Sequence, residues 1–197
     1  MLHCQTLTYY NQNAQSFITN TVSVDFTVTQ IRFTTNLPQG ATILDFGCGS
    51  GRETKHFLSQ GYQVEAIDGS KELCKLASEY TGIPVKHMLF QELDAEEQYD
   101  GIWACSSILH LPLEELKPVL EKMAKALKPQ GIIYTSFKYG DFAGERNGRY
   151  FTDMTETSFA ALMQDITALK TEEQWITSDV RPGRGEEKWL NVILRKK

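Results

Sequence analysis

The residues best suited to chemistry are an acid and three glycines, in the run Asp45-Phe-Gly47-Cys-Gly49-Ser-Gly51-Arg52. A short apolar stretch at 41–44 precedes the run, and a helical pattern begins near residue 53. Glycines at alternate positions let the backbone turn sharply and approach a ligand that a Cβ would keep away. A strand, a glycine-rich turn and a helix in this order are typical of a nucleotide-binding loop.

The spacing of the glycines separates two kinds of ligand. The dinucleotide pattern is G-x-G-x-x-G, with a pyrophosphate on the helix N-terminus. Here the third glycine comes one residue early and Asp45 precedes the first. An acid at this place would repel a pyrophosphate but accepts hydrogen bonds from an ammonium group. The alternative reading is that Asp45 only caps the following turn.

A second acid follows the glycine run after one predicted helix. Asp68 ends the segment Val64-Glu-Ala-Ile-Asp68-Gly69-Ser70, which we interpret as the end of a strand. A carboxylate there accepts hydrogen bonds from two neighbouring ribose hydroxyls, as the acid on the second strand does for NAD. Asp before Gly-Ser is also common in turns and caps. Together with the glycine run, Asp68 indicates a nucleoside ligand.

Strand and helix patterns alternate through the first two thirds of the chain. The apolar and glycine patterns predict strands at 42–46, 63–67, 84–88, 100–105 and 132–137, with a turn at 129–131 before the last. They predict helices at 53–60, 70–80 and 116–127, with Pro118 in the first turn of the third. This alternation is typical of the α/β class and of a doubly wound parallel sheet.

The two ends of the chain follow a different pattern. The last third predicts a helix at 155–163 and two strands at 167–178 and 188–195, joined by a turn at 181–185. The N-terminal part predicts helices at 11–20 and 24–35. No linker or repeat divides the chain, so we expect one domain over 1–197. Its parts are an N-terminal helical cap at 1–38, a cofactor-binding core at 41–137, and a substrate-side helix with a C-terminal hairpin at 138–197.

The pattern D-x-G-x-G-x-G at the end of a first strand resembles motif I of the class I S-adenosylmethionine-dependent methyltransferases. Segment 99–111 resembles the family's fourth motif, and the resemblance covers 41–137. The chain is similar to small-molecule enzymes of the tellurite-resistance and ubiquinone-biosynthesis types. The family has a Rossmann-like seven-stranded sheet, mostly parallel with the last strand antiparallel, and helices on both faces. The implied activity is methyl transfer to a small molecule by direct in-line displacement, with S-adenosylmethionine as cofactor and S-adenosylhomocysteine as product.

The resemblance places the cofactor against the glycine turn and the ends of the following strands. The implied cofactor-binding residues are Asp45, Gly47, Cys48, Gly49, Gly51, Arg52, Asp68, Gly69, Ser70, Gln91, Glu92, Leu93, Ala104, Cys105 and Ser106. Gln91 or Glu92 would contact the adenine amine, although the family usually has Asp followed by a small residue there. Phe90 or Leu93 would pack against the adenine ring. The small side chains at 104–106 leave room for an incoming nucleophile.

Candidates for catalysis and substrate binding lie outside this set. His110 suits general-base work near neutral pH, or it packs beside the cofactor without a chemical role. Tyr9 or Tyr10 could stabilise the sulfonium with its ring face, and we take Tyr10 as the second catalytic candidate. Basic residues concentrate after the fifth strand and in the 181–185 turn, where the default alternative is solvated surface charge. The predicted substrate-binding residues are Tyr9, Lys138, Arg149, Arg181, Arg184 and Trp189. Because Arg binds carboxylates bidentately, they indicate a small, anionic acceptor.

Length, charge and cysteine content limit the number of domains and the kinds of partner that we expect. The 197 residues suit a single core, and the net charge of −5 gives no basic footprint for nucleic acid. The sequence has no run of about 18 apolar residues and no secretion-signal layout at its N-terminus, so we expect a cytoplasmic protein without membrane contacts. Cys4, Cys48, Cys74 and Cys105 form no C-x-x-C pair, which disfavours disulfides and a metal site. We expect a monomer or a homodimer.

Two other functions remain. A nicotinamide-dependent oxidoreductase would need the G-x-G-x-x-G spacing, which the sequence lacks. A catalytically silent protein that binds the same cofactor on the same fold is compatible with every motif described above.

Overall fold

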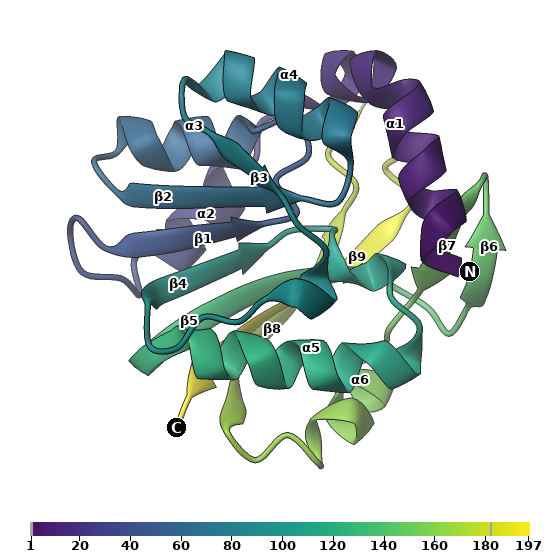
Figure 1. Cartoon of the computed structure of the whole chain (residues 1–197). Helices are drawn as coiled ribbons and strands as arrows, with labels where there is room; N and C mark the ends of the chain where they lie inside the picture. The colour runs from purple at the N-terminus through teal and green to yellow at the C-terminus, as the bar shows by residue number, and fades with distance from the viewer. Residues whose placement is uncertain (1, 182) are drawn as a thin grey trace.

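A seven-stranded sheet organises the molecule (Figure 1). The computed structural model describes residues 2–181 and 183–197, and side chains from residue 5 onward. The strands lie in the order β3-β2-β1-β4-β5-β9-β8. Their bounds are β1 Thr42–Phe46, β2 Gln63–Asp68, β3 Val85–His87, β4 Tyr99–Ala104, β5 Leu127–Lys138, β8 Leu169–Ser178 and β9 Lys188–Lys196.

Strand directions confirm the predicted topology. Strands β1 to β5 pair in parallel, whereas β9 lies antiparallel between β5 and β8. The sheet is therefore mostly parallel with the last strand inserted antiparallel, as expected. Helices cover both of its faces (Figure 1). On one side are α2 (Thr27–Thr34), α3 (Arg52–Ser59) and α4 (Lys71–Thr81), and on the other α5 (Leu113–Ala126) and α6 (Glu156–Met163).

Successive residues of a strand point to opposite faces of the sheet, so the core has one part under each helix layer. Trp103 of β4 packs with Phe33 of α2 and Phe57 of α3. Its neighbour Ile102 belongs to the other cluster, with Leu120 of α5. Successive strand residues point to opposite faces, so a continuous apolar run is what a sheet covered on both sides requires. This double burial fixes the carboxyl edge of the sheet, where the candidate site lies.

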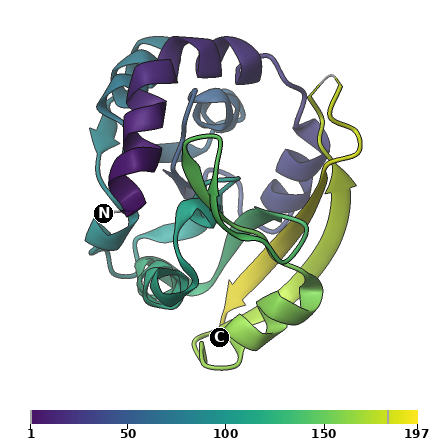
Figure 2. The same cartoon turned by 90° about the vertical axis from the view of Figure 1, so that its right-hand side faces the viewer.

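Two further elements cover that carboxyl edge (Figure 2). They are the helix α1 (Leu2–Thr21) and a hairpin made of β6 (Ala143–Arg146) and β7 (Arg149–Thr152). The Thr6 hydroxyl of α1 accepts a hydrogen bond from the backbone N–H of Tyr150 at 3.0 Å. The Asn11 side-chain oxygen accepts one from the Ser70 hydroxyl at 2.8 Å. These contacts hold α1 across the sheet edge.

The structure corrects several predicted boundaries. Helix α1 starts at residue 2 instead of 11, and the β6–β7 hairpin was not predicted. Helix α5 starts at Leu113, which places Pro118 in its second turn. Strand β5 starts at Leu127 and runs through the predicted 129–131 turn, because a register shift opposite Gly101 and a positive φ of 64° at Gln130 absorb the irregularity. Within the described ranges, none of the helices combines the length and apolarity needed to cross a bilayer.

Candidate functional site

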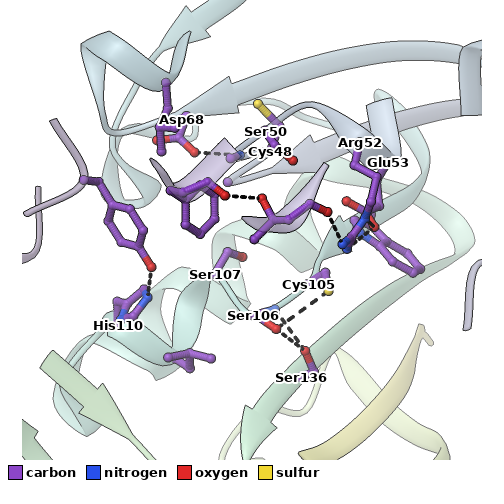
Figure 3. A pocket seen from close by; sticks show the side chains of 18 of the residues that line it. Cys48, Ser50, Arg52, Glu53, Asp68, Cys105, Ser106, Ser107, His110 and Ser136 are labelled. Atoms are coloured by element: carbon purple, nitrogen blue, oxygen red, sulfur yellow. Dashed lines mark hydrogen bonds and ion pairs between the residues drawn. The ribbon is translucent and has the colours of Figure 1, made fainter. Parts of the chain in front are cut away.

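A cavity at the carboxyl edge of the sheet, beneath α1, collects most of the predicted site residues (Figure 3). We call it the inner cavity. The wall is formed by the glycine turn, the ends of β2, β4 and β5, helix α1, the segment 177–181 and Arg184. The predicted residues that line it are Tyr10, Asp45, Gly47, Cys48, Gly49, Arg52, Asp68, Gly69, Gln91, Cys105, Ser106, His110, Lys138, Arg149, Arg181, Arg184 and Trp189.

Six predicted residues lie outside this lining: Tyr9, Gly51, Ser70, Glu92, Leu93 and Ala104. Leu93 and Ala104 are buried in the core beside α5. The Ser70 hydroxyl accepts the backbone N–H of Leu73 and so caps α4. The Glu92 carboxylate bonds to a backbone N–H at the start of its own short 3-10 turn (Phe90–Glu92). For these four, local structure accounts for the residue without a ligand.

Protein neighbours explain why the turn needs glycine. Gly47 has a φ of 88°, and a Cβ on it would lie 2.6 Å from the Cβ of Ser107. Gly51 has a φ of 75°, and its Cβ would lie 2.6 Å from a methyl group of Thr81. L residues rarely adopt such φ values, and the clashes add to the cost. The close approach expected for a ligand is therefore made here by the protein itself, while the backbone at Gly47 still lines the cavity.

Asp68 hydrogen-bonds to the glycine turn and also lines the inner cavity. Its Oδ2 accepts the backbone N–H of Gly49 at 2.9 Å and its Oδ1 accepts that of Ser70 at 2.8 Å. Burial raises the pKa of this carboxyl, and the two N–H bonds oppose the rise. Each oxygen keeps a further lone pair. The carboxylate braces the glycine turn and still has acceptor capacity toward the cavity, so the ribose contact stays a prediction.

The glycine-turn end of the cavity is acidic. Asp45 is 2% exposed and accepts the Thr54 hydroxyl at 2.6 Å. Burial raises the pKa of Asp45 to about 8, and the charge of Glu53 adds to the rise. Arg52 donates to Glu53 at 2.6 Å and to the backbone oxygen of Thr21 at 2.9 Å, so its charge is engaged. In the free protein Asp45 is therefore largely protonated near neutral pH. A ligand ammonium beside it would favour the ionised carboxylate, whereas a pyrophosphate would be repelled by the carboxylates at this end.

The part of the cavity wall where adenine is predicted to bind contains both predicted and missed residues. Phe90 lines the cavity with its ring 4.8 Å from that of Phe46. Met88 and Leu89 extend this apolar wall, although neither was predicted. Gln91 also lines the cavity and donates to the carboxylate of Glu115. Of the two adenine candidates, Gln91 and not Glu92 borders the cavity.

His110 and Tyr10 form a directed hydrogen-bond pair. The Nδ1 of His110 lies 2.6 Å from the backbone oxygen of Tyr150. That oxygen can only accept, so Nδ1 carries the proton and Nε2 accepts from the Tyr10 hydroxyl at 2.8 Å. Burial lowers the pKa of His110 to about 4. A neutral imidazole with this pKa is a weak base, and its geometry holds the Tyr10 hydroxyl in place.

Arg149 is a cation without a counterion among the described residues. Its guanidinium lies 4.5 Å from the ring centre of Tyr9 and 5.2 Å from that of Phe151. Its Nη1 is 3.4 Å from the Tyr10 hydroxyl, and its buried Nε has no hydrogen-bond acceptor. Tyr9 thus stays outside the lining but supports the arginine that belongs to it. An unpaired guanidinium in a cavity is suited to bind an oxyanion.

The other three predicted cations are paired with acids. Lys138 bonds to Glu187, and Arg184 lies 3.8 Å from the same carboxylate. Arg181 donates through Nε to Asp179 at 2.9 Å. All three line the cavity together with Arg149. The predicted convergence of basic residues is present, but acids offset much of their charge.

The predicted 181–185 turn is anchored by Asp179. Burial would raise the pKa of Asp179, and the hydrogen bonds from Arg181 outweigh it and bring the pKa to about 2. Asp179 also accepts the indole N–H of Trp189 at 3.1 Å, which places that tryptophan against the turn. Pro182, a part of the predicted turn, lies outside the described residues.

The ends of the neighbouring strands β4 and β5 contribute a thiol and two hydroxyl side chains to the inner cavity. Cys105 is a free thiol, and burial raises its pKa to about 12, so it is neutral. Ser106 has a φ of 52° and donates its backbone N–H to the Ser136 hydroxyl at 2.9 Å (Figure 3). Ser136 was missed, although its place at the end of the fifth strand could have indicated it. Phe17 of α1 also lines the cavity, and no sequence signal indicated it.

Comparison with known proteins shows what the glycine-turn segment is similar to. Residues 43–131 match a family described as a methyltransferase domain. This segment contains the glycine turn, Asp68 and the end of β4. Over this segment, which is somewhat less than half of the chain, the protein is similar to methyltransferase domains, in agreement with the predicted resemblance to class I S-adenosylmethionine-dependent methyltransferases.

Individual curated relatives match the chain over only part of its length. The chain is 32% identical over 106 residues to "Ubiquinone biosynthesis O-methyltransferase" of Xanthomonas axonopodis pv. citri, covering 50% of this chain and 44% of the relative. The chain thus spans about half the length of the curated relatives it matches.

Solved structures agree in fold. A Burkholderia thailandensis 1,6-didemethyltoxoflavin-N1-methyltransferase, crystallised with 1,6-didemethyltoxoflavin and S-adenosylhomocysteine, superposes with a TM-score of 0.76 at 23% identity, over 96% of this chain and 85% of that one. A TehB-like methyltransferase from Corynebacterium glutamicum gives 0.70 at 20% identity, over 97% and 98%.

Proposed function

We propose that this protein transfers a methyl group from S-adenosylmethionine to a small anionic molecule by direct in-line displacement. One observation carries the proposal: the inner cavity joins an acidic end at the glycine turn to a basic end at Arg149. A cationic cofactor and an anionic acceptor would then meet in one enclosed space. The family match supports the cofactor, and the charge distribution supports the acceptor class.

The residues present fit the cofactor's parts. Asp45 and Glu53 would face its ammonium group, Asp68 its ribose hydroxyls and Phe90 its adenine ring. The bound cofactor would supply an electrophilic methyl group on a sulfonium. The acidic turn stabilises positive charge there, and burial beneath α1 excludes water from it. Binding these groups in line is the chain's main task.

At the other end, Arg149 and Tyr10 would orient the acceptor. Arg149 offers a guanidinium that has no acidic partner in the described part of the chain, and the Tyr10 hydroxyl is fixed by donating to His110. Proximity and orientation can supply roughly 7–11 kcal/mol of a barrier, so no covalent catalyst is required. The neutral His110 acts as a positioning residue in this account. The same reasoning gives Cys105, a protonated thiol, no nucleophilic role.

Methyl donation itself is the direct test. The protein is incubated with S-adenosylmethionine labelled in its methyl group and with a fractionated small-molecule extract. We expect S-adenosylhomocysteine together with a labelled product enriched in the anionic fractions, and much less of both with the Asp68→Ala variant at the same low cofactor concentration. Tight cofactor binding without any labelled product would instead support the catalytically silent alternative.

Partners and location remain expectations of the same proposal. The net charge of −5 disfavours nucleic acid. We propose a cytoplasmic monomer or homodimer of one domain that acts on a free small molecule.

A further inference from the structure

A second cavity adjoins the inner cavity on the side of the β6–β7 hairpin. We call it the outer cavity; the hairpin, the end of β5 and the segment 183–188 form it. It shares Lys138, Arg149, Phe151 and Arg184 with the inner cavity. The two spaces therefore meet along one wall. The end-on view in Figure 2 shows the hairpin lying across this side of the sheet edge.

The lining of the outer cavity is rich in charge, with more basic than acidic side chains. The basic residues are Lys138, Arg146, Arg149, Arg184 and Lys188, and the acidic ones are Asp153, Glu186 and Glu187. The excess is positive in a chain whose net charge is −5. A basic lining against an acidic background favours an anionic ligand.

Two arginines of the hairpin leave buried donors unused. Arg146 and Arg149 lie over the ring of Phe151, at 4.9 and 5.2 Å from its centre. Arg146 bonds through Nη2 to both oxygens of Asp153 at 2.7 Å. The Nε of Arg146 and the Nε of Arg149 are buried without an acceptor among the described residues. Buried donors are normally satisfied, so this pair points to an acceptor supplied by a ligand.

From this geometry we infer that the outer cavity is an anion subsite for the acceptor's carboxylate, separate from the place of methyl transfer. The inference rests on the proposed function and specifies it. The substrate is an elongated molecule whose carboxylate lies between Arg146 and Arg149, while its methyl-accepting atom reaches past Tyr10 into the inner cavity. A compact anion that reacts at its own charged group would leave the outer cavity unused.

The test uses benzoate as the carboxylate probe and benzamide as its neutral match. Each is titrated by calorimetry into the protein, with and without saturating S-adenosylhomocysteine. The first variant is Arg149→Gln, which strands no carboxylate because Arg149 has no acidic partner among the described residues. The second is the double variant Arg146→Gln with Asp153→Asn, which removes both members of a half-buried ion pair together. Lys170→Gln, at an exposed position of β8, is the matched charge control.

Benzoate is expected to bind more tightly than benzamide, and each arginine variant to weaken benzoate about tenfold, as loss of a charge-assisted hydrogen bond implies. Lys170→Gln should bind benzoate like the parent. Equal binding of the two probes, or equal losses in all three variants, would overturn the subsite. Failure to bind S-adenosylhomocysteine would contradict the proposed function alone, because titration without it still tests the anion subsite.

Discussion

At the scale of single residues, Asp45 couples ligand charge to folding. Its carboxyl is buried, and its pKa is raised to about 8, first by burial and then by Glu53. In an unfolded chain an Asp ionises near pH ~3.9. The folded protein therefore binds this proton more tightly, and Asp45 makes folding less favourable as the pH rises from about 4 to 8. A ligand ammonium beside the carboxylate would offset this cost.

Replacing Asp45 by Asn should therefore stabilise the free protein and weaken cofactor binding. We expect a gain of about 1–3 kcal/mol in unfolding free energy at pH 8 and a smaller gain at pH 5, because the cost of keeping the folded carboxyl protonated while the unfolded one is ionised grows with pH across this range. Urea denaturation at both pH values measures it, with the exposed Asp94→Asn as control. A change that is the same at both pH values would contradict a buried, protonated Asp45.

Asp68 has two roles that can be separated. It braces the backbone at Gly49 and Ser70, and we predict that it also binds ribose hydroxyls. Asp68→Ala should weaken S-adenosylhomocysteine by about 1.5–3 kcal/mol, because charged hydrogen bonds are lost. An analogue without the two ribose hydroxyls should lose much less on the same substitution. If calorimetry shows equal losses for both ligands, Asp68 acts only as a brace of the turn.

His110 should remain neutral well below its ordinary range. Burial lowers its pKa to about 4, so its proton uptake is expected near that pH in an NMR titration of the ring. The signal is assigned by its loss in His110→Asn. Because the unfolded residue is protonated below about pH 6.5, stability attributable to His110 should fall as the pH drops toward 4. A midpoint between pH 6 and 7 would restore His110 as a candidate general base.

At the scale of elements, the glycine turn depends on packing against its neighbours. Gly47 and Gly61 have nearly equal φ values of 88° and 86°, but only Gly47 has atoms where a Cβ would lie. Gly61→Ala should cost about 1–2 kcal/mol from backbone strain. Gly47→Ala should cost about 1–3 kcal/mol more from overpacking against Ser107. Equal losses in chemical denaturation would mean that the turn shifts freely.

Elements that carry their own pattern could be predicted from the sequence. Strand β1 was predicted at its observed bounds, and the helix predicted at 70–80 is α4, which begins after Ser70, because these signals are local. The β6–β7 hairpin lacks a continuous apolar run and was missed. Side-chain contacts between residues far apart in the sequence were also missed. No local pattern joins Tyr10 to His110, or Lys138 to Glu187.

Site residues could likewise be predicted where a local pattern positions them, but not where long-range contacts do. Residues at the ends of predicted strands, such as Asp68 and Cys105, came to the cavity because parallel strands end at one edge of a sheet. The ion pairs that the basic residues form could not be predicted. Their acidic partners Asp179 and Glu187 lie on a turn whose position depends on the antiparallel insertion of β9.

At the scale of the whole molecule, we infer that the inner cavity is suited to a cationic nucleoside without phosphates. The acidic turn, the engaged Arg52 and the family match all bear on this claim. Calorimetric titration of the purified protein with S-adenosylmethionine, S-adenosylhomocysteine and NAD tests it most directly. We expect both sulfur-containing nucleosides to bind at one site per chain and NAD to give no heat of binding. Binding of NAD in preference to either of them would contradict the account.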